Sequence, residues 1–170
     1  MLLNRKTFVA LALLALAGCG FSPLYGGPQG KTASAALEDV KIQTIPDRAG
    51  QLLYQALQQD FYRNGQPVQS LYLLSVSYNI SQTGVGIQAD SSTTRIRFNA
   101  VAQWRLSPIG MPAQTLASGT ATAMDALNII DQQYFAVNLQ TQAVNQQLAN
   151  QISTQVTAQL AAWFRAHPNP

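Results

Sequence analysis

The sequence predicts an α+β fold, a two-layer sandwich in which two helices pack on one face of a mainly antiparallel four-stranded sheet. Two long segments alternate apolar and polar residues with the period of two that marks a half-buried strand. A third segment, near the C-terminus, carries a long apolar stripe with helical spacing. The expected order of strand, helix, three strands and helix places both helices over the same face of the sheet.

The first predicted elements are a short strand and a helix. Residues 40–45 alternate and end at Pro46, which predicts a strand. Asp47 is a candidate N-cap for a following helix, and Asn64 and Gly65 provide its stop signal. The apolar residues of this helix repeat at every fourth position: Leu53, Leu57 and Phe61.

Three strands are predicted in the middle of the chain, at residues 72–80, 96–106 and 115–124. The glycine-containing segment Gly84–Gly86 predicts a loop that runs on to Ser92. Small residues on one face of the third strand would let a helix approach closely. The residues expected to face the helices are Tyr72, Leu74, Val76, Tyr78 and Ile80, then Ile96, Phe98, Ala100, Ala102, Trp104 and Leu106, then Ala117, Gly119, Ala121 and Ala123.

One long helix is predicted from Asp131, a candidate N-cap, to Arg165, with Pro168 beyond its end. Its apolar stripe consists of Val144, Leu148, Ile152, Val156, Leu160 and Phe164. A helix of this length matches the long strands, so that it can run along the sheet.

The N-terminus has the three parts of a secretory signal: the basic Arg5 and Lys6, an apolar run over residues 8–16, and small residues before Cys19. Leu16-Ala17-Gly18-Cys19 is the pattern of a lipoprotein signal, in which the cysteine thiol carries the lipid. We therefore expect residues 1–18 to be a signal peptide, 19–36 a lipidated cysteine and flexible tether, and 37–170 a single domain. A plain signal peptide or an anchor helix is the alternative, although the apolar run is short for a membrane span.

Two or more acyl chains, such as the diacylglyceryl group and palmitate, hold a protein on a membrane durably. In similar lipoproteins an Asp after the cysteine favours retention in the inner membrane, whereas here Gly20 follows Cys19. The sequence therefore predicts a lipid-anchored protein of the outer membrane.

Charged residues make up 10% of the chain, against about 25% in ordinary soluble domains. Without Arg5 and Lys6, eight basic residues remain against seven acidic ones, a formal charge of about +1. This near-neutrality argues against nucleic-acid binding, which needs clustered Lys and Arg. Amides and hydroxyls cost less to desolvate than ions, so a polar neutral surface suits enclosure by a polar cavity. Lineage bias in amino-acid usage is the alternative explanation.

The sequence contains no recognisable catalytic constellation. The sole histidine, His167, lies beside Pro168 in the C-terminal tail, which suits a solvated residue better than a base or ligand. The aspartates are scattered, and Gly84–Gly86 lacks the third glycine of a dinucleotide loop. We therefore expect no enzymatic activity, no cofactor and no metal site.

Arg95, Arg97 and Arg105 share one face of the predicted strand 96–106, opposite its apolar face. Arg95 and Arg97 should lie about 7 Å apart. Guanidinium groups at that spacing could clamp phosphates, such as those of outer-membrane lipids. An ordinary solvated sheet face is the alternative.

The stretch from Leu16 through Cys19 to Gly26, LAGCGFSPLYG, resembles the start of the LptE family of lipopolysaccharide-assembly lipoproteins. The order and length of the predicted elements also agree with that family. The resemblance implies a two-layer α/β fold that plugs the LptD barrel in the outer membrane. It also implies that the protein faces the periplasm and the barrel lumen, and that it binds lipopolysaccharide through basic residues.

The expected function is thus a non-enzymatic lipoprotein that plugs and helps assemble LptD and contacts lipopolysaccharide, with Arg95, Arg97 and Arg105 as candidate binding residues. Two other classes stay open. One is an accessory lipoprotein of another envelope system, such as a pilotin or a lipid-transport auxiliary. The other is an envelope hydrolase, which would need a Ser or Thr nucleophile paired with an acidic residue.

The first prediction concerns lipidation. Because Cys19 is the only cysteine of the chain, Cys19→Ala should abolish both acylation and cleavage of the signal peptide. Intact-mass measurement of protein purified from membranes tests this, with Gly20→Ala as a control that keeps the thiol. A mature wild-type protein that starts elsewhere, or that lacks acyl mass, contradicts the prediction.

Overall fold

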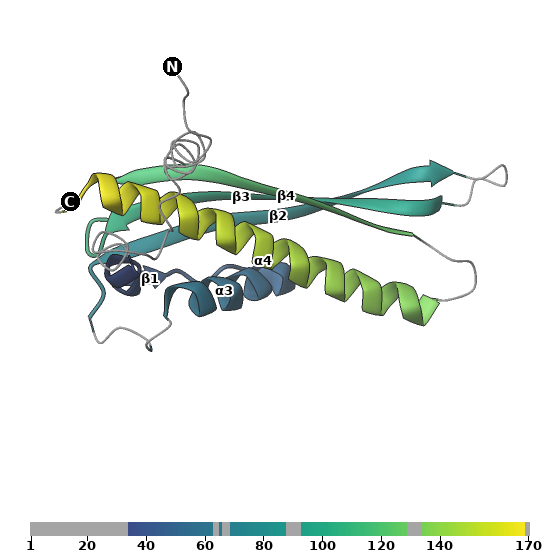
Figure 1. The fold of residues 1–170 in the computed structure, drawn as a ribbon, viewed down its shortest axis with the longest axis horizontal. Helices are drawn as coiled ribbons and strands as arrows, with labels where there is room; N and C mark the ends of the chain where they lie inside the picture. Colours follow the sequence, from purple (N-terminus) through teal and green to yellow (C-terminus); the bar gives the residue numbers. More distant parts are fainter. Residues whose placement is uncertain (1–33, 63–64, 66–68, 88–92, 129–133, 169–170) are drawn as a thin grey trace, which may run out of the picture.

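The computed structural model describes residues 34–62, 65, 69–87, 93–128 and 134–168 of the 170-residue chain. Figure 1 shows an elongated molecule in which strands and one long helix run side by side. The predicted order of the elements is confirmed. Their bounds are β1 Val40–Ile42, α3 Asp47–Phe61, β2 Tyr72–Ile87, β3 Thr93–Pro108, β4 Ala117–Asn128 and α4 Tyr134–Ala166.

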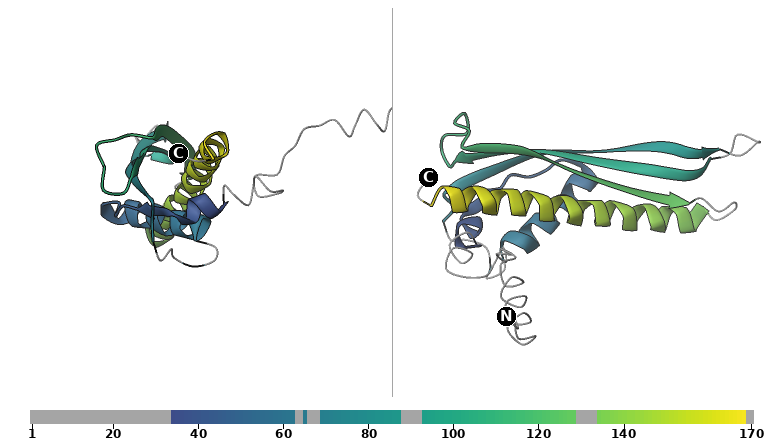
Figure 2. Two further views of the ribbon diagram at one scale, coloured as in Figure 1. Left: turned by 90° about the vertical axis from the view of Figure 1, so that its left-hand side faces the viewer. Right: turned by 45° about the horizontal axis from the view of Figure 1, so that its top comes forward.

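The four strands form one sheet in the order β1-β2-β3-β4. β1 runs parallel to β2, while the other two pairs are antiparallel. Helix α3 packs against β1 and β2, α4 packs against β3 and β4, and the two helices pack on each other. Both helices cover the same face of the sheet, as the views of Figure 2 show. The predicted fold class is therefore confirmed.

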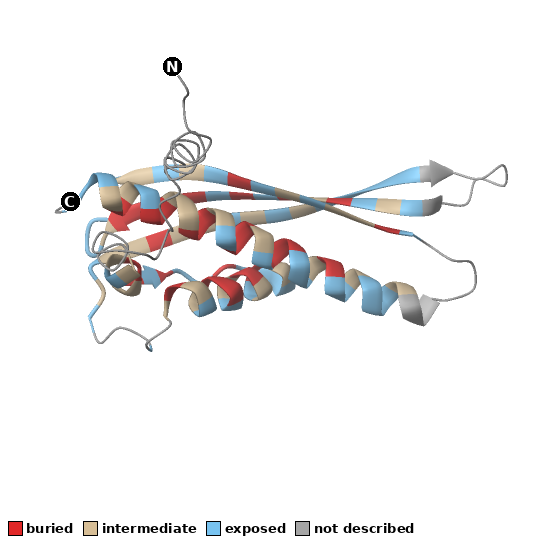
Figure 3. Ribbon diagram, viewed as in Figure 1, coloured by how far each residue is buried: buried red, intermediate tan, exposed pale blue. Residues whose placement is uncertain are grey.

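The period-two pattern of β3 is confirmed residue by residue. Phe98, Ala100, Ala102, Trp104 and Leu106 are buried against the helices, while Arg95, Arg97, Val101, Gln103 and Arg105 are exposed on the other face. In Figure 3 the buried positions accordingly alternate with exposed ones along the strands. The stripe predicted for the C-terminal helix is buried throughout: Val144, Leu148, Ile152, Val156, Leu160 and Phe164.

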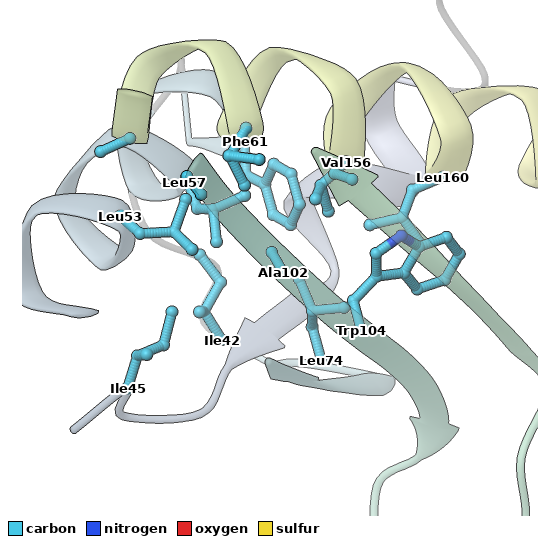
Figure 4. Close-up of a cluster of buried hydrophobic side chains, with 14 of the residues drawn as sticks. Ile42, Ile45, Leu53, Leu57, Phe61, Leu74, Ala102, Trp104, Val156 and Leu160 are labelled. Atoms are coloured by element: carbon cyan, nitrogen blue, oxygen red, sulfur yellow. The ribbon is translucent and has the colours of Figure 1, made fainter. Parts of the chain in front are cut away.

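The core lies where α3, the first half of β2 and the second half of α4 converge. Figure 4 shows Leu53, Leu57 and Phe61 of α3 beside residues of β1, β2 and α4. The fully buried Leu53, Leu57 and Leu74 each remove apolar surface from water, at about 25 cal/mol per Å². The Tyr62 hydroxyl donates a 2.7 Å hydrogen bond to the Val40 carbonyl, which fixes the end of α3 to β1.

The small face of β4 brings α4 close to the sheet, as the sequence predicts. A Cβ atom on Gly119 would lie 2.7 Å from the Trp104 ring and 2.9 Å from Gln159 Oε1. The Trp104 indole donates a 2.7 Å hydrogen bond to that same Gln159 oxygen. Only glycine leaves room for this contact between the helix and two strands.

The predicted loop at Gly84–Gly86 is wrong. β2 continues to Ile87, and Gly84 and Gly86 pair with Ile96 and Arg95 of β3. The register shifts between Gly84 and Ile87. Glycine commonly marks such irregular pairing within a strand, so these residues distort the ladder without ending it.

The entry to α3 also differs from the prediction. β1 ends at Ile42 rather than residue 45, because the chain leaves the sheet so that Ile45 can join the core. Pro46, in an extended conformation, holds the N-cap position and Asp47 is the first helical residue, with no side-chain capping bond. Asp47 has φ of 67°, a left-handed conformation that Asp tolerates better than most residues.

Element ends shift by a few residues elsewhere. α3 ends at Phe61, before the predicted stop, and β4 spans Ala117–Asn128 rather than 115–124. Residues 34–38, which overlap the expected tether, are helical and bury Leu37 in the core. Cys19, Asn64 and Asp131 lie outside the described residues.

The second prediction tests the register of β3. Trp104→Asp should lower the free energy of unfolding by at least about 3 kcal/mol, because it removes a buried aromatic ring and buries a charge. Gln103→Asp, one position away on the exposed face, should cost less than about 1 kcal/mol. Urea denaturation of both variants measures the difference, and equal losses would contradict the assignment of the two faces.

Candidate functional site

The helix-free face of the sheet carries all three arginines that the sequence predicts as a binding site. Arg95, Arg97 and Arg105 are exposed there, on one side of β3. The strand order places β2 and β4 on either side of them. This face is therefore the candidate functional site.

The three arginines fall into two places. Arg95 and Arg97 lie at the end of the sheet where β2 passes into β3, and their cross-strand neighbours are uncharged: Gly86, Asn128, Thr83 and Ala126. Arg105 lies at the opposite end, between Ser75 and Ser118. The separation between positions 97 and 105 is roughly 27 Å at about 3.4 Å per residue. Thus Arg95 and Arg97 can act on one ligand group, while Arg105 stands apart.

Arg105 lines a shallow hollow of about 560 Å³ on this face. Its other lining groups are mainly hydroxyls and amides, and the Ser75 hydroxyl donates a 2.6 Å hydrogen bond to Gln43 Oε1. One guanidinium among neutral polar groups suits a sugar, a peptide or a single phosphate. The polar residues that line the hollow include Gln43, Ser75, Ser77, Gln103, Arg105 and Thr120.

Between its two ends the helix-free face is uncharged. The middle rows place Asn79, Val101 and Thr122 side by side, next to Ser81, Asn99 and Met124. Val101 and Met124 are 40% and 63% exposed, which adds some apolar surface to this polar face. The arrangement offers a wide contact surface with one pair of charges at its far end.

The hollow could not be found from the sequence. It depends on the parallel pairing of β1 with β2, which brings Gln43 and Thr44 beside Ser75 and Ser77. Those residues are more than thirty positions apart, and no local sequence pattern predicts that β1 pairs with β2. The arginines, in contrast, were identified from the alternation of one strand.

Three titratable groups lie outside the helix-free face. Asp60 of α3 accepts a 2.6 Å hydrogen bond from the buried Ser153 hydroxyl of α4. Burial raises the pKa of Tyr78 to about 12. His167 stacks on Trp163, with ring centroids 4.8 Å apart. Within the described residues, no three of the His, Cys, Asp and Glu side chains gather as metal ligands would.

Among the helices that the structure describes, none combines the length and the hydrophobicity needed to cross a bilayer.

Comparison with known proteins gives structures of similar fold and no match by sequence. No protein-family model and no curated protein matches the chain. A candidate lipoprotein from Caulobacter crescentus has a TM-score of 0.64 at 21% identity, over 81% of this chain and 98% of its own. This chain shares the fold of that protein.

Two further structures are also similar, with TM-scores of 0.55. Rare lipoprotein B from Shewanella oneidensis is 7% identical over 72% of this chain and 92% of its own. An uncharacterised lipoprotein B from Nitrosomonas europaea is 12% identical over 75% of this chain and 86% of its own. The fold therefore recurs among proteins named lipoproteins, at identities that carry the architecture alone.

Proposed function

We propose that this chain is an outer-membrane lipoprotein that plugs the LptD barrel, helps it assemble, and contacts lipopolysaccharide during transport to the cell surface. The observation that carries the proposal is the broad helix-free face of the sheet, whose middle is uncharged and whose three arginines lie at its two ends. In this proposal the protein is not an enzyme.

Three observations support the lipoprotein part of the proposal. The N-terminal sequence ends a signal-like segment at the only cysteine of the chain. The proteins that share its fold are named as lipoproteins. Leu37, which is buried in the core, lies 18 positions after Cys19. The intervening segment can link a lipid anchor to the domain.

The chemistry of the helix-free face supports the plug role. The lumen of a large outer-membrane barrel is polar. The middle of this face, between Arg105 and the pair Arg95 and Arg97, consists mainly of neutral polar residues. Such a surface can exchange its water for a polar wall at low desolvation cost, whereas a surface rich in ions would lose more. The core of the domain is already closed on the other side by α3 and α4, so this face is available for contact.

The pair Arg95 and Arg97 supports contact with the lipid. Charge-assisted hydrogen bonds from guanidinium to phosphate are strong, and two groups on one side of a strand can engage neighbouring phosphates. Arg105 adds a third candidate contact at the other end of the face.

The leading rival is an accessory lipoprotein of another envelope system, such as a pilotin or a lipid-transport auxiliary. Both proposals share the anchor and the fold. They differ in the partner, so affinity purification of the tagged protein from membranes, followed by mass spectrometry, discriminates between them.

The third prediction concerns the barrel. Depletion of this protein should lower the amount of correctly assembled LptD and weaken the permeability barrier of the outer membrane, because the plug stabilises the folded barrel. Heat-modifiable mobility of LptD on gels measures assembly, and uptake of a large antibiotic measures the barrier. Re-expression of the wild-type chain should restore both. Normal LptD assembly in depleted cells would favour the accessory-lipoprotein rival.

The fourth prediction concerns the arginine pair. Replacing both Arg95 and Arg97 by Gln should raise the Kd for lipopolysaccharide about tenfold or more, because it removes two charge-assisted contacts to phosphate. A tenfold change in Kd corresponds to about 1.4 kcal/mol of binding free energy. Added salt should weaken the wild type in the same direction, because it screens exposed charges. Equilibrium binding to purified lipopolysaccharide provides the measurement.

The matched control for this test replaces Lys41 and Arg48 with Gln, because both are exposed and lie outside β3. It removes the same formal charge from β1 and the first turn of α3, with Lys41 paired to the start of β2 at the opposite end of the sheet from Arg95 and Arg97, and should leave binding nearly unchanged. If both double variants lose affinity equally, binding depends on net charge alone. Unchanged affinity in the Arg95 and Arg97 variant would show that these arginines are an ordinary solvated face.

A further inference from the structure

The outer edge of β2 is open along most of its length. β1 pairs with β2 only at Tyr72, Leu73 and Leu74, whereas β2 continues to Ile87. One more bond, from the Gln43 amide to the Leu74 carbonyl at 2.9 Å, ends the contact with the first strand. In Figure 1, β1 and α3 lie along one half of β2, and the strand runs on beyond them.

The backbone direction at the start of β2 shows which groups face this edge. The Tyr72 amide donates to the Asp39 carbonyl and the Leu74 carbonyl accepts from Gln43, both on the β1 side. Because successive residues of a strand point their hydrogen-bonding groups to opposite sides, the next residues that face the edge are Val76, Tyr78, Ile80 and Gln82. In the part of the chain that the structure describes, no backbone partner meets their N–H and C=O groups.

At the opposite edge of the sheet, side chains bond some of the outward backbone groups of β4. On β4, the Gln155 side chain bonds both backbone groups of Thr122, at 3.2 and 2.8 Å, and Gln159 bonds the Thr120 carbonyl at 3.1 Å. The amide of Ala126 donates to the Asp125 carboxylate at 2.7 Å. Helix α4 therefore supplies side-chain amides that occupy part of the β4 edge, whereas no described side chain bonds the outward backbone groups of β2 from Val76 to Gln82.

The open edge also lacks the usual protection against pairing. Natural proteins shield exposed edges with charges, proline or very short strands. β2 is 16 residues long, and its sequence YLLSVSYNISQTGVGI contains neither a charge nor a proline. The hollow lined by Gln43, Thr44 and Ser77 adjoins the point where β1 leaves the edge. It provides room for the side chains of an added strand.

We propose that the edge of β2 from Val76 to Gln82 binds an extended, uncharged segment of the LptD chain as a fifth strand of the sheet. This inference rests on the proposed function. The row of unpaired donors and acceptors is matched by another extended backbone, and the uncharged β2 strand fits a neutral segment. A seven-residue edge, about 24 Å at about 3.4 Å per residue, is long enough for specific pairing.

The test compares two substitutions at Gln82, which is exposed. Gln82→Pro removes one outward N–H and places a ring on the edge, whereas Gln82→Ala keeps the N–H. Because no described residue accepts a hydrogen bond from that N–H, proline at this edge position should leave the melting temperature close to that of the alanine variant. LptD recovered with tagged protein from membranes should fall about tenfold for proline relative to alanine.

A second measurement avoids any substitution. Residue-resolved amide hydrogen exchange is compared for the wild-type protein alone and in its complex with LptD. The amides of Tyr78, Ile80 and Gln82 should exchange at least about tenfold more slowly in the complex, because they gain partners. Asn79 and Ser81, whose amides already face β3, serve as internal controls.

The outcomes separate this inference from the function on which it rests. Failure of the wild-type protein to recover LptD would overturn the proposed function and the inference together. Recovery of LptD with equal amounts for both Gln82 variants and unchanged exchange of the edge amides would overturn the inference alone. A dimer of the isolated protein that Gln82→Pro dissociates would assign the edge to a second copy of this chain and overturn the inference as well.

Discussion

The approach of α4 to β4 at Gly119 is the contact on which the rest of the structure depends. The missing side chain lets the Trp104 ring and Gln159 meet over the strand, where a Cβ would lie 2.7 Å from the ring. This closeness sets the height of the helix above the sheet. It allows the apolar stripe from Val144 to Phe164 to pack on β3 and β4, and it brings Gln155 within reach of the β4 edge.

The same contact divides the molecule into two parts with different roles. The helix-covered face contains most of the buried apolar side chains and therefore provides most of the hydrophobic stabilisation. The helix-free face is largely exposed and adds little to the core. Glutamines of α4 serve both parts, since Gln159 fixes Trp104 and also occupies the edge of β4. The abundance of glutamine in this helix thus has a structural reason besides solubility.

The parts of the fold that local patterns decide were predictable, and the parts that distant pairing decides were not. The two faces of β3 follow from the alternation of residue types, because apolar residues of a half-buried strand face the core and polar residues face the solvent. The strand at Gly84–Gly86 was missed, since glycines that usually end a strand are held here by pairing with Ile96 and Arg95. Asp47 was misassigned because Pro46 and the burial of Ile45 fix the start of α3.

The candidate site also has parts that the sequence predicted and parts that it did not. One strand was enough to place Arg95, Arg97 and Arg105 on a common face. Their separation into a pair and a single residue follows from the same spacing once the strand is known to be continuous. The hollow and the open edge of β2 both arise where β1 stops, and only the assembled sheet shows where that is.

Both ends of the described chain lie at the same end of the long axis. Residues 34–38 precede β1, which pairs with the start of β2, and Gln159 near the end of α4 contacts Thr120 near the start of β4. The end of β2 and the start of β3 lie at the opposite end (Figure 1). β3 alone spans roughly 54 Å at about 3.4 Å per residue. The sheet therefore acts as a spacer: Arg95 and Arg97 lie at a set distance from residues 34–38, and shortening the strands would bring the two arginines closer to the end of the sheet where β1 pairs with β2.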